Sequence, residues 1–233
     1  MQTDRDNAMR PVYLFNPSYD ERNINFYNLG LVSIASHLKR KGIPAHVYMN
    51  YLDERATRDK DYDLVLPQIL KENPMFVGIS CMTTQYDKAL DLAKRIKALS
   101  PETPIYWGGH HVNAYHTQLA REHRDVVDTC VVGWGEKILE GIYYDKYIGS
   151  GSPFNHPLDF STVVNYQPVE RLMRGRMVKQ ASIMTSYGCP FSCRFCINAI
   201  QEKQVIYRDL NAVAHEIKQV GRMGANSIAF YVE

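Results

Sequence analysis

The sequence predicts an α/β fold in which a five-stranded parallel sheet, flavodoxin-like or Rossmann-like, carries helices on both faces. The main observation is an alternation, repeated about five times over residues 11–148, of short β-branched or aromatic runs with longer amphipathic stretches. A second is the almost continuously apolar run at residues 75–80, which is typical of a strand covered on both faces. Both patterns indicate right-handed strand–helix–strand crossovers and therefore parallel strands.

Each strand is expected where β-branched and aromatic residues gather before a turn signal. Asn16-Pro17 stops the first strand and Gly108-Gly109 follows the fourth, because Pro and Gly are the strongest local breakers of regular structure. In chain order the expected strands cover residues 12–15, 45–48, 75–80, 104–107 and 126–132.

Each helix is expected where apolar residues recur every three or four positions. Gly42 ends the first helix after a basic last turn, Asn73-Pro74 ends the second and Ser100-Pro101 the third. In chain order the expected helices cover residues 29–41, 61–72, 84–99, 114–122 and 136–147. Ligands of such sheets bind at the carboxyl ends of the strands, so the informative loops are 16–28, 80–84, 108–113 and 133–136.

Composition excludes several classes of protein. Of the 233 residues, 45% are hydrophobic and 22% charged, and the mean hydropathy is -0.34, values that are ordinary for a globular chain. The 27 basic and 25 acidic residues give a net charge of +2, so nucleic-acid binding has no support from composition. No apolar run approaches the roughly 18 to 20 residues of a membrane span, and we expect a cytoplasmic protein.

Three units are expected along the chain: the α/β domain at residues 1–149, a linker packed between domains at 150–180, and a second domain at 181–233. The linker begins with the flexible stretch 149–153, and Pro157 and Pro168 break any periodicity after it. The last unit predicts a strand, a helix and a strand at residues 182–186, 210–223 and 227–232. Since these three elements cannot close a core of their own, the sequence is expected to be truncated.

Three of the five cysteines, Cys189, Cys193 and Cys196, lie within eight residues in a C-x3-C-x2-C spacing after an apolar strand. Such a group indicates a metal or cluster site in a reducing compartment rather than a disulfide framework. Three thiolates can hold a [4Fe-4S] cluster and leave its fourth iron open for a small chelating cofactor. Zinc is the alternative, but it needs a fourth ligand, and the next histidine, His215, lies inside a predicted helix.

With Phe195 before the last cysteine, this loop matches the signature of the radical S-adenosylmethionine superfamily. The stretches Thr185–Pro190 and Tyr207–Leu210 resemble the subgroup that has an N-terminal cobalamin-binding domain. The preceding domain also resembles that subgroup, whose loops match Gly78-Ile79-Ser80, Thr83, Gly108-Gly109-His110-His111 and Gly133-Trp134-Gly135-Glu136. The resemblance implies that residues 181–233 begin a partial (β/α) barrel.

In that family a reduced [4Fe-4S] cluster gives one electron to S-adenosylmethionine, and a 5'-deoxyadenosyl radical results. The resemblance implies that Cys189, Cys193 and Cys196 hold the cluster. It further implies that Phe195 lies near the adenine and that Glu233 binds the amino group of S-adenosylmethionine.

For cobalamin, the resemblance implies that the corrin rests on the strand ends while its nucleotide tail enters the sheet. Ser80 and Thr83 would offer hydroxyls to the tail, and Gly108 and Gly109 would allow close backbone approach. Further contacts are expected from the turn that contains Gly133, Gly135 and Glu136. The pattern D-x-H-x-x-G, which supplies a histidine ligand in cobalamin mutases, is absent, so a vestigial flavodoxin-like module that binds nothing remains an alternative.

The function that the resemblance implies is methyl transfer to an unactivated carbon or phosphorus centre, with a small-molecule or natural-product substrate. An external electron donor of the flavodoxin or ferredoxin type would be its partner. Alternatives are a radical rearrangement or cyclisation in which cobalamin donates no methyl group, and a cluster- or cobalamin-binding module without catalysis. An RNA methylthiotransferase is a weaker alternative, since it brings a second cysteine trio and only Cys81 and Cys130 remain. We read these two cysteines as small core residues.

Overall fold

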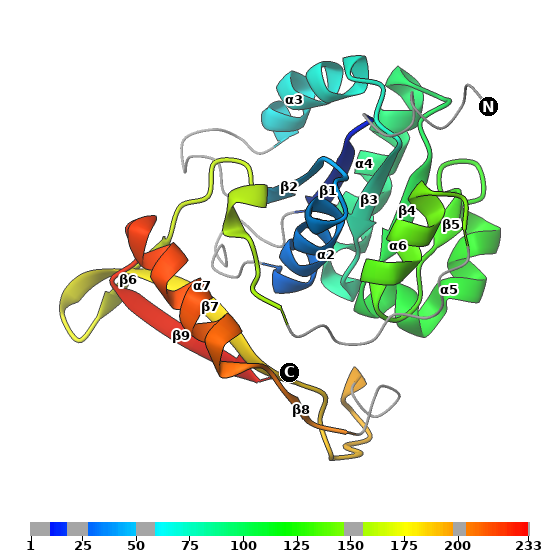
Figure 1. Cartoon of the computed structure of the whole chain (residues 1–233). Helices are drawn as coiled ribbons and strands as arrows, with labels where there is room; N and C mark the ends of the chain where they lie inside the picture. Colours follow the sequence, from blue (N-terminus) through cyan, green and yellow to red (C-terminus); the bar gives the residue numbers. More distant parts are fainter. Residues whose placement is uncertain (1–9, 18–27, 50–58, 147–155, 198–203, 233) are drawn as a thin grey trace.

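The computed structural model describes residues 10–17, 28–49, 59–146, 156–197 and 204–232, and it contains two sheets (Figure 1). The first sheet has the order β2-β1-β3-β4-β5, and all of its pairings are parallel. This order is the flavodoxin-like one, so the predicted fold class is confirmed. Its strands are β1 (Val12–Asn16), β2 (Ala45–Met49), β3 (Phe76–Ser80), β4 (Ile105–Gly108) and β5 (Thr129–Cys130).

Helices cover both faces of this sheet, with α2 and α6 in front of it in Figure 1. Because side chains alternate along β1, Val12 and Leu14 belong to the core under α2 and α6, whereas Tyr13 and Phe15 belong to the core under α3, α4 and α5. The helices are α2 (Leu29–Arg40), α3 (Asp59–Lys71), α4 (Tyr86–Leu99), α5 (His110–Glu122) and α6 (Gly135–Tyr143).

The fifth strand is shorter than expected. Residues 126–132 were expected to form it, but only Thr129 and Cys130 do. Val126 and Val127 instead donate their backbone N–H groups to the His123 carbonyl, in the turn that follows α5. Their side chains are buried, so the apolar run reflects a packed turn as much as a strand.

Helix α5 begins at His110, earlier than the expected start at residue 114. His110 and His111 are therefore in its first turn and not in a loop. Helix α6 ends at Tyr143, short of the expected residue 147. A single 3-10 turn, η1 (Thr83–Gln85), precedes α4 where the sequence predicts helix from residue 84.

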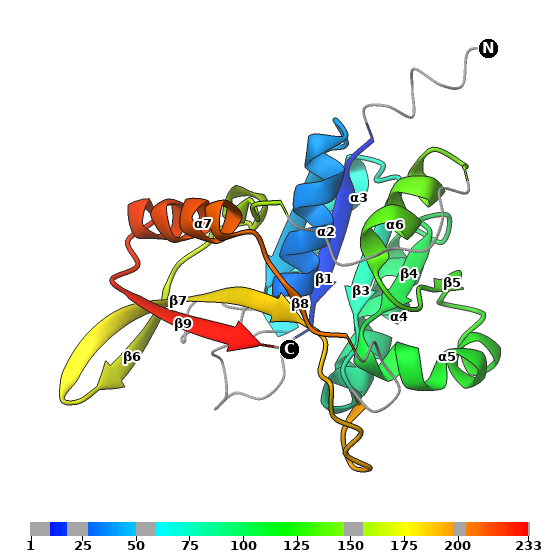
Figure 2. The same ribbon diagram turned by 60° about the horizontal axis from the view of Figure 1, so that its bottom comes forward.

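The second sheet is built around the long strand β7 (Arg176–Tyr187). It pairs antiparallel with β6 (Val169–Met173) and β8 (Ile206–Tyr207), and parallel with β9 (Ser227–Val232). Helix α7 (Leu210–Arg222) lies along this sheet, as Figure 2 shows.

A β-hairpin occupies part of the segment 150–180 that we expected to be a linker. β6 and the first residues of β7 form it, and the strand expected at residue 182 therefore begins at Arg176. Arg174 and Gly175 connect the two strands with φ angles of 48° and 75°. Two positive φ angles suit the twist of a two-residue hairpin turn, but arginine at the first position is not one of the residues that signal it.

The two sheets share a hydrophobic core. One cluster of buried residues includes Val32 and Leu38 of α2 together with Ile183 of β7 and Val220 of α7. The 3-10 turn η2 (Phe160–Thr162) lies between them, and the residues after it continue along the edge of β2, where Val164 N donates to Val47 O at 2.9 Å. Among the described residues no helix is long and apolar enough to cross a membrane.

Candidate functional site

The carboxyl ends of β1 and β3 are joined by a cluster of neutral polar side chains. Asn28 donates through Nδ2 to Asn16 Oδ1 at 3.1 Å and to Ser80 Oγ at 2.8 Å. Its own Oδ1 accepts from Leu31 N at 3.2 Å, so the same side chain caps α2. We predicted Ser80 but missed Asn16 and Asn28. The sequence could have predicted this cap, because asparagine is a preferred N-cap residue and Asn28 directly precedes the apolar helix.

Gly109 holds the end of β4 close to the end of β3. Its φ of 99° lies in the region that favours glycine, and a Cβ there would lie 2.9 Å from Cys81 O and 3.2 Å from Ser80 Oγ. Gly108 is less constrained, because its added Cβ would be 3.7 Å from Val131 O. Gly109 therefore allows the backbone at the end of β4 to lie against the backbone at the end of β3.

Thr83 and His111 continue this edge on the side of α4 and α5. Thr83 Oγ1 and His111 Nδ1 lie 3.1 Å apart, and burial lowers the pKa of His111. The neutral imidazole can therefore accept a hydrogen bond from the threonine hydroxyl near pH 7. Tyr86 packs beside them, with ring centroids 5.2 Å from His111, and its hydroxyl lies 2.5 Å from His123 Nε2.

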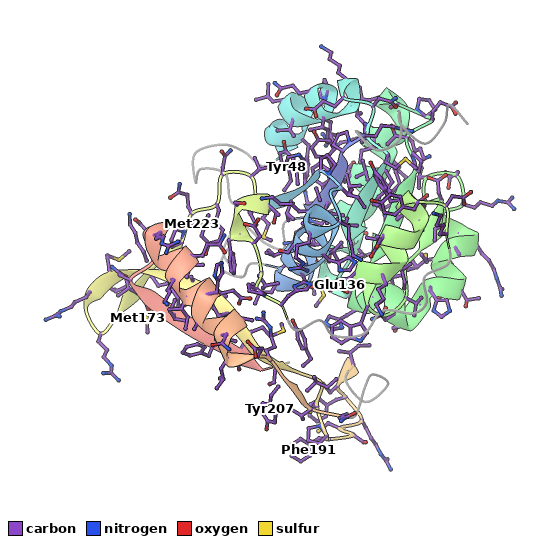
Figure 3. All side chains as sticks on the ribbon, in the orientation of Figure 1. Tyr48, Glu136, Met173, Phe191, Tyr207 and Met223 are labelled. Carbon is purple, nitrogen blue, oxygen red and sulfur yellow. The ribbon has the colours of Figure 1, made fainter. Side chains whose placement is uncertain are left out.

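The residues of the turn before α6 that we expected to contact cobalamin lie in two different places. Gly133 lies at the strand ends, where its N–H donates to Asn113 Oδ1 at 3.0 Å. Gly135 and Glu136 face α2 instead, where Glu136 is buried and accepts a hydrogen bond from Ser33 (Figure 3). Gly135 permits that helix contact, because a Cβ would lie 2.7 Å from Ile34 Cδ1.

This edge is chemically suited to cobalamin. Its polar groups are amides, hydroxyls and the neutral imidazole of His111, and apolar side chains are exposed beside them, with Met82 at 39% and Val132 at 42% exposure. A corrin carries amide arms around an apolar face, so neutral donors and acceptors beside apolar surface match both parts.

The cysteine loop follows β7 through Gly188, whose φ is 81°. Cys193 is exposed and Cys189 and Cys196 are partly exposed, and Cys196 N donates to Cys193 O at 3.0 Å. Within the described ranges no three His, Cys, Asp or Glu side chains are gathered to hold a metal ion. The three thiols suit iron–sulfur ligation by number and type, but the described loop does not preform the ligand geometry.

The other predicted residues of this region differ in their surroundings. Phe195, which the resemblance places near the adenine, is 94% exposed, and Phe191 is 68% exposed and lies at the outer end of the loop in Figure 3. His215 is exposed on α7. Glu233 lies outside the described residues.

The remaining two cysteines belong to the first domain. Cys81 is fully buried, and burial raises its pKa to about 12, while Cys130 packs against the same core. Both stay thiols at neutral pH, in agreement with the predicted core role.

Comparisons with known proteins agree with this geometry. Residues 21–143 match the family model of the B12 binding domain, which is more than half of the chain. The chain is 28% identical over 155 residues to an uncharacterized methyltransferase of Pyrococcus horikoshii, and 25% identical over 215 residues to hopanoid C-3 methylase of Methylococcus capsulatus. These matches cover 57% and 79% of the chain but only 33% and 39% of the relatives, so the chain spans well under half of their length.

Two solved structures share the fold over nearly the whole chain. The radical S-adenosylmethionine methyltransferase TsrM from Kitasatospora setae, with cobalamin and a [4Fe-4S] cluster bound, has a TM-score of 0.70 at 17% identity, and the match covers 97% of this chain and 48% of TsrM. The cobalamin-dependent S-adenosylmethionine radical enzyme OxsB, with aqua-cobalamin and S-adenosylmethionine bound, has a TM-score of 0.69 at 13% identity, covering 97% of this chain and 34% of OxsB.

Proposed function

Because the chain belongs to the B12 binding domain family, we propose that it works as part of a cobalamin-dependent radical S-adenosylmethionine enzyme that methylates an unactivated centre. One observation carries the proposal: the α/β domain of that family and three thiols in C-x3-C-x2-C spacing occur on one chain, joined by a shared core. Neither feature alone distinguishes this enzyme class from a simple cofactor carrier.

Cobalamin would lie at the carboxyl edge of the first sheet. The corrin would rest over the ends of β3, β4 and β5, where Met82 and Val132 expose apolar surface. Thr83 and the Asn28–Ser80 pair would supply hydrogen bonds to its amide arms or nucleotide tail. When bound, cobalamin would supply a carrier for the methyl group.

The cysteine loop would hold the [4Fe-4S] cluster through Cys189, Cys193 and Cys196. When bound, the cluster would deliver the single electron that cleaves S-adenosylmethionine, taken from an external donor of the flavodoxin or ferredoxin type. Ligation would gather the three thiols of this exposed loop, because metal binding supplies the free energy for ordering its own ligands. Phe195, exposed next to Cys196, is free to pack on the adenine of a bound S-adenosylmethionine.

The substrate is proposed to be a small molecule or natural product, and the compartment a reducing one such as the cytoplasm, where thiols persist. The names of the two curated relatives support methyl transfer as the reaction.

The test is anaerobic reconstitution of the whole protein with iron, sulfide and hydroxocobalamin, followed by a visible spectrum and an assay for 5'-deoxyadenosine after reduction. Absorbance of both cluster and corrin together with deoxyadenosine is the expected result. Deoxyadenosine without retained corrin would eliminate cobalamin-dependent methyl transfer, and bound cofactors without deoxyadenosine would leave a non-catalytic module. Absence of the cluster would contradict the role of the three cysteines.

A further inference from the structure

An aromatic contact links the two candidate sites, the carboxyl edge of the first sheet and the cysteine loop. Trp134, in the turn before α6, packs edge-on against Tyr187, the last residue of β7, with ring centroids 5.3 Å apart and ring planes at 86°. Tyr187 stands two positions before Cys189, and Trp134 follows the end of β5. The contact therefore connects the carboxyl edge of the first sheet to the stem of the cysteine loop.

The backbone on both sides of Trp134 is held in place. Before it, Gly133 N donates to Asn113 Oδ1 at 3.0 Å. After it, Gly135 lies so close to α2 that an added Cβ would be 2.7 Å from Ile34 Cδ1. The indole is thus presented from a turn that the first domain fixes on two sides.

Tyr187 is also held by its own sheet. Its side chain is 5% exposed, and its backbone pairs with Ile206 of β8, on the far side of the cysteine loop. The chain directly after β8 is also hydrogen-bonded to β7, since Arg208 N donates to Thr185 O at 3.0 Å. Tyr187 and Ile206, which flank the cysteine loop in the sequence, are therefore paired in the second sheet, and Trp134 packs on Tyr187.

We propose that Trp134 is a positioning residue, whose ring holds the stem of the cysteine loop against the cobalamin-binding edge and so sets the separation of the two cofactors. The inference rests on the proposed function, because only that function requires both cofactors to act on one substrate. Separation matters there, since a misplacement of roughly 1 Å can lower a rate about a hundredfold.

The test measures the separation directly. The whole protein is loaded anaerobically with cobalamin and cluster. It is then reduced until the cobalamin is cob(II)alamin and the cluster is in its one-electron-reduced form, so that both are paramagnetic. The electron-spin relaxation rate of cob(II)alamin then reports the distance to the cluster, because dipolar coupling falls steeply with separation. A Cys189→Ala variant without cluster gives the baseline rate.

We expect Trp134→Ala to keep its iron and cobalamin but to lose most of the relaxation enhancement that the cluster causes in the wild type. Trp134→Phe, which retains a ring that can pack on Tyr187, should keep most of it. The matched control is Tyr144→Ala, which removes a 43% exposed ring from the opposite end of α6 and should leave the enhancement unchanged. A purely structural contribution would change the melting temperature and not this relaxation rate.

An unchanged enhancement in Trp134→Ala would overturn the inference while leaving the proposed function intact. Should Trp134→Ala fail to fold, Trp134→Leu fills the space without a ring and is judged by the same criterion. A wild-type protein that holds neither cluster nor corrin would instead defeat the proposed function, so the two failures are distinguishable.

Discussion

Arg208 and Glu216 form an ion pair in which neither side chain has exposed surface. The guanidinium donates to both carboxylate oxygens, and also to Met184 O at 2.9 Å and His156 O at 3.0 Å. Glu216 in turn accepts from Leu158 N at 2.6 Å. One buried pair therefore joins β7, α7 and the segment that leads to η2.

Replacing Glu216 by Gln should lower the free energy of unfolding by about 3–5 kcal/mol, because the Arg208 charge would stay buried without its counter-ion. Urea unfolding at pH 7 measures the change. The double variant with Arg208→Met and Glu216→Leu should lose less free energy of unfolding than the sum of the losses in Arg208→Met alone and Glu216→Leu alone. Simple additivity would mean that the charges do not act as a pair.

Gly109→Ala should destabilise the first domain by about 1–3 kcal/mol, because the added methyl group meets Cys81 O at 2.9 Å at a φ of 99°. Cobalamin retention after reconstitution should fall as well, since the end of β3 must shift. Gly108→Ala is the matched control, because its nearest atom would be 3.7 Å away. Equal retention by the two variants would argue against the corrin site at this edge.

Asn28→Ala should cost about 1–2 kcal/mol, because it removes the cap of α2 and both hydrogen bonds to the strand ends. Ser80→Ala removes only the bond at 2.8 Å. A double-mutant cycle by thermal unfolding should show a positive coupling between Asn28 and Ser80. Zero coupling would show that the two side chains do not support each other.

Stability should fall with acid because of His156. Burial first, and then the Arg40 charge, lower the pKa of His156 to about 3. Below pH 6.5 His156 binds a proton in the unfolded chain but not in the folded chain. The free energy of unfolding therefore decreases as pH falls from about 6.5 towards 3. The loss should be about 2–5 kcal/mol, the upper value applying if solvent screens none of the shift. His156→Gln should flatten the curve of unfolding free energy against pH, and an equally steep curve in that variant would contradict the role of His156.

Alanine at Cys189, Cys193 or Cys196 should abolish iron retention after reconstitution, since a cluster held by three thiolates does not tolerate the loss of one. Cys81→Ala should retain iron, because that thiol is buried in the first domain. Iron and sulfide analysis on the isolated variants decides the matter. Loss of iron from a correctly folded Cys81→Ala variant would indicate that Cys81 is a ligand and would contradict this assignment.

Much of the fold was determined by the sequence alone. The apolar run at 75–80 and the alternation of elements predicted the parallel sheet, because burial on both faces leaves a local pattern that needs no knowledge of partners. The resemblance of the first domain to a cobalamin-binding domain, read from the strand-end glycines, was confirmed by the match to the B12 binding domain family. The radical S-adenosylmethionine assignment rests on the cysteine loop and stays a proposal.

Other features were decided only by the tertiary structure. Glu136 sits in a loop motif by sequence, yet its buried bond to Ser33, 103 positions away, places it between α2 and α6. The hairpin of β6 and β7 has an unusual turn residue, and the Trp134–Tyr187 contact joins the turn before α6 to the end of β7. The physical reason is common to all three: local periodicity reports which face of an element is buried, but the partner that buries it is chosen by packing between distant segments.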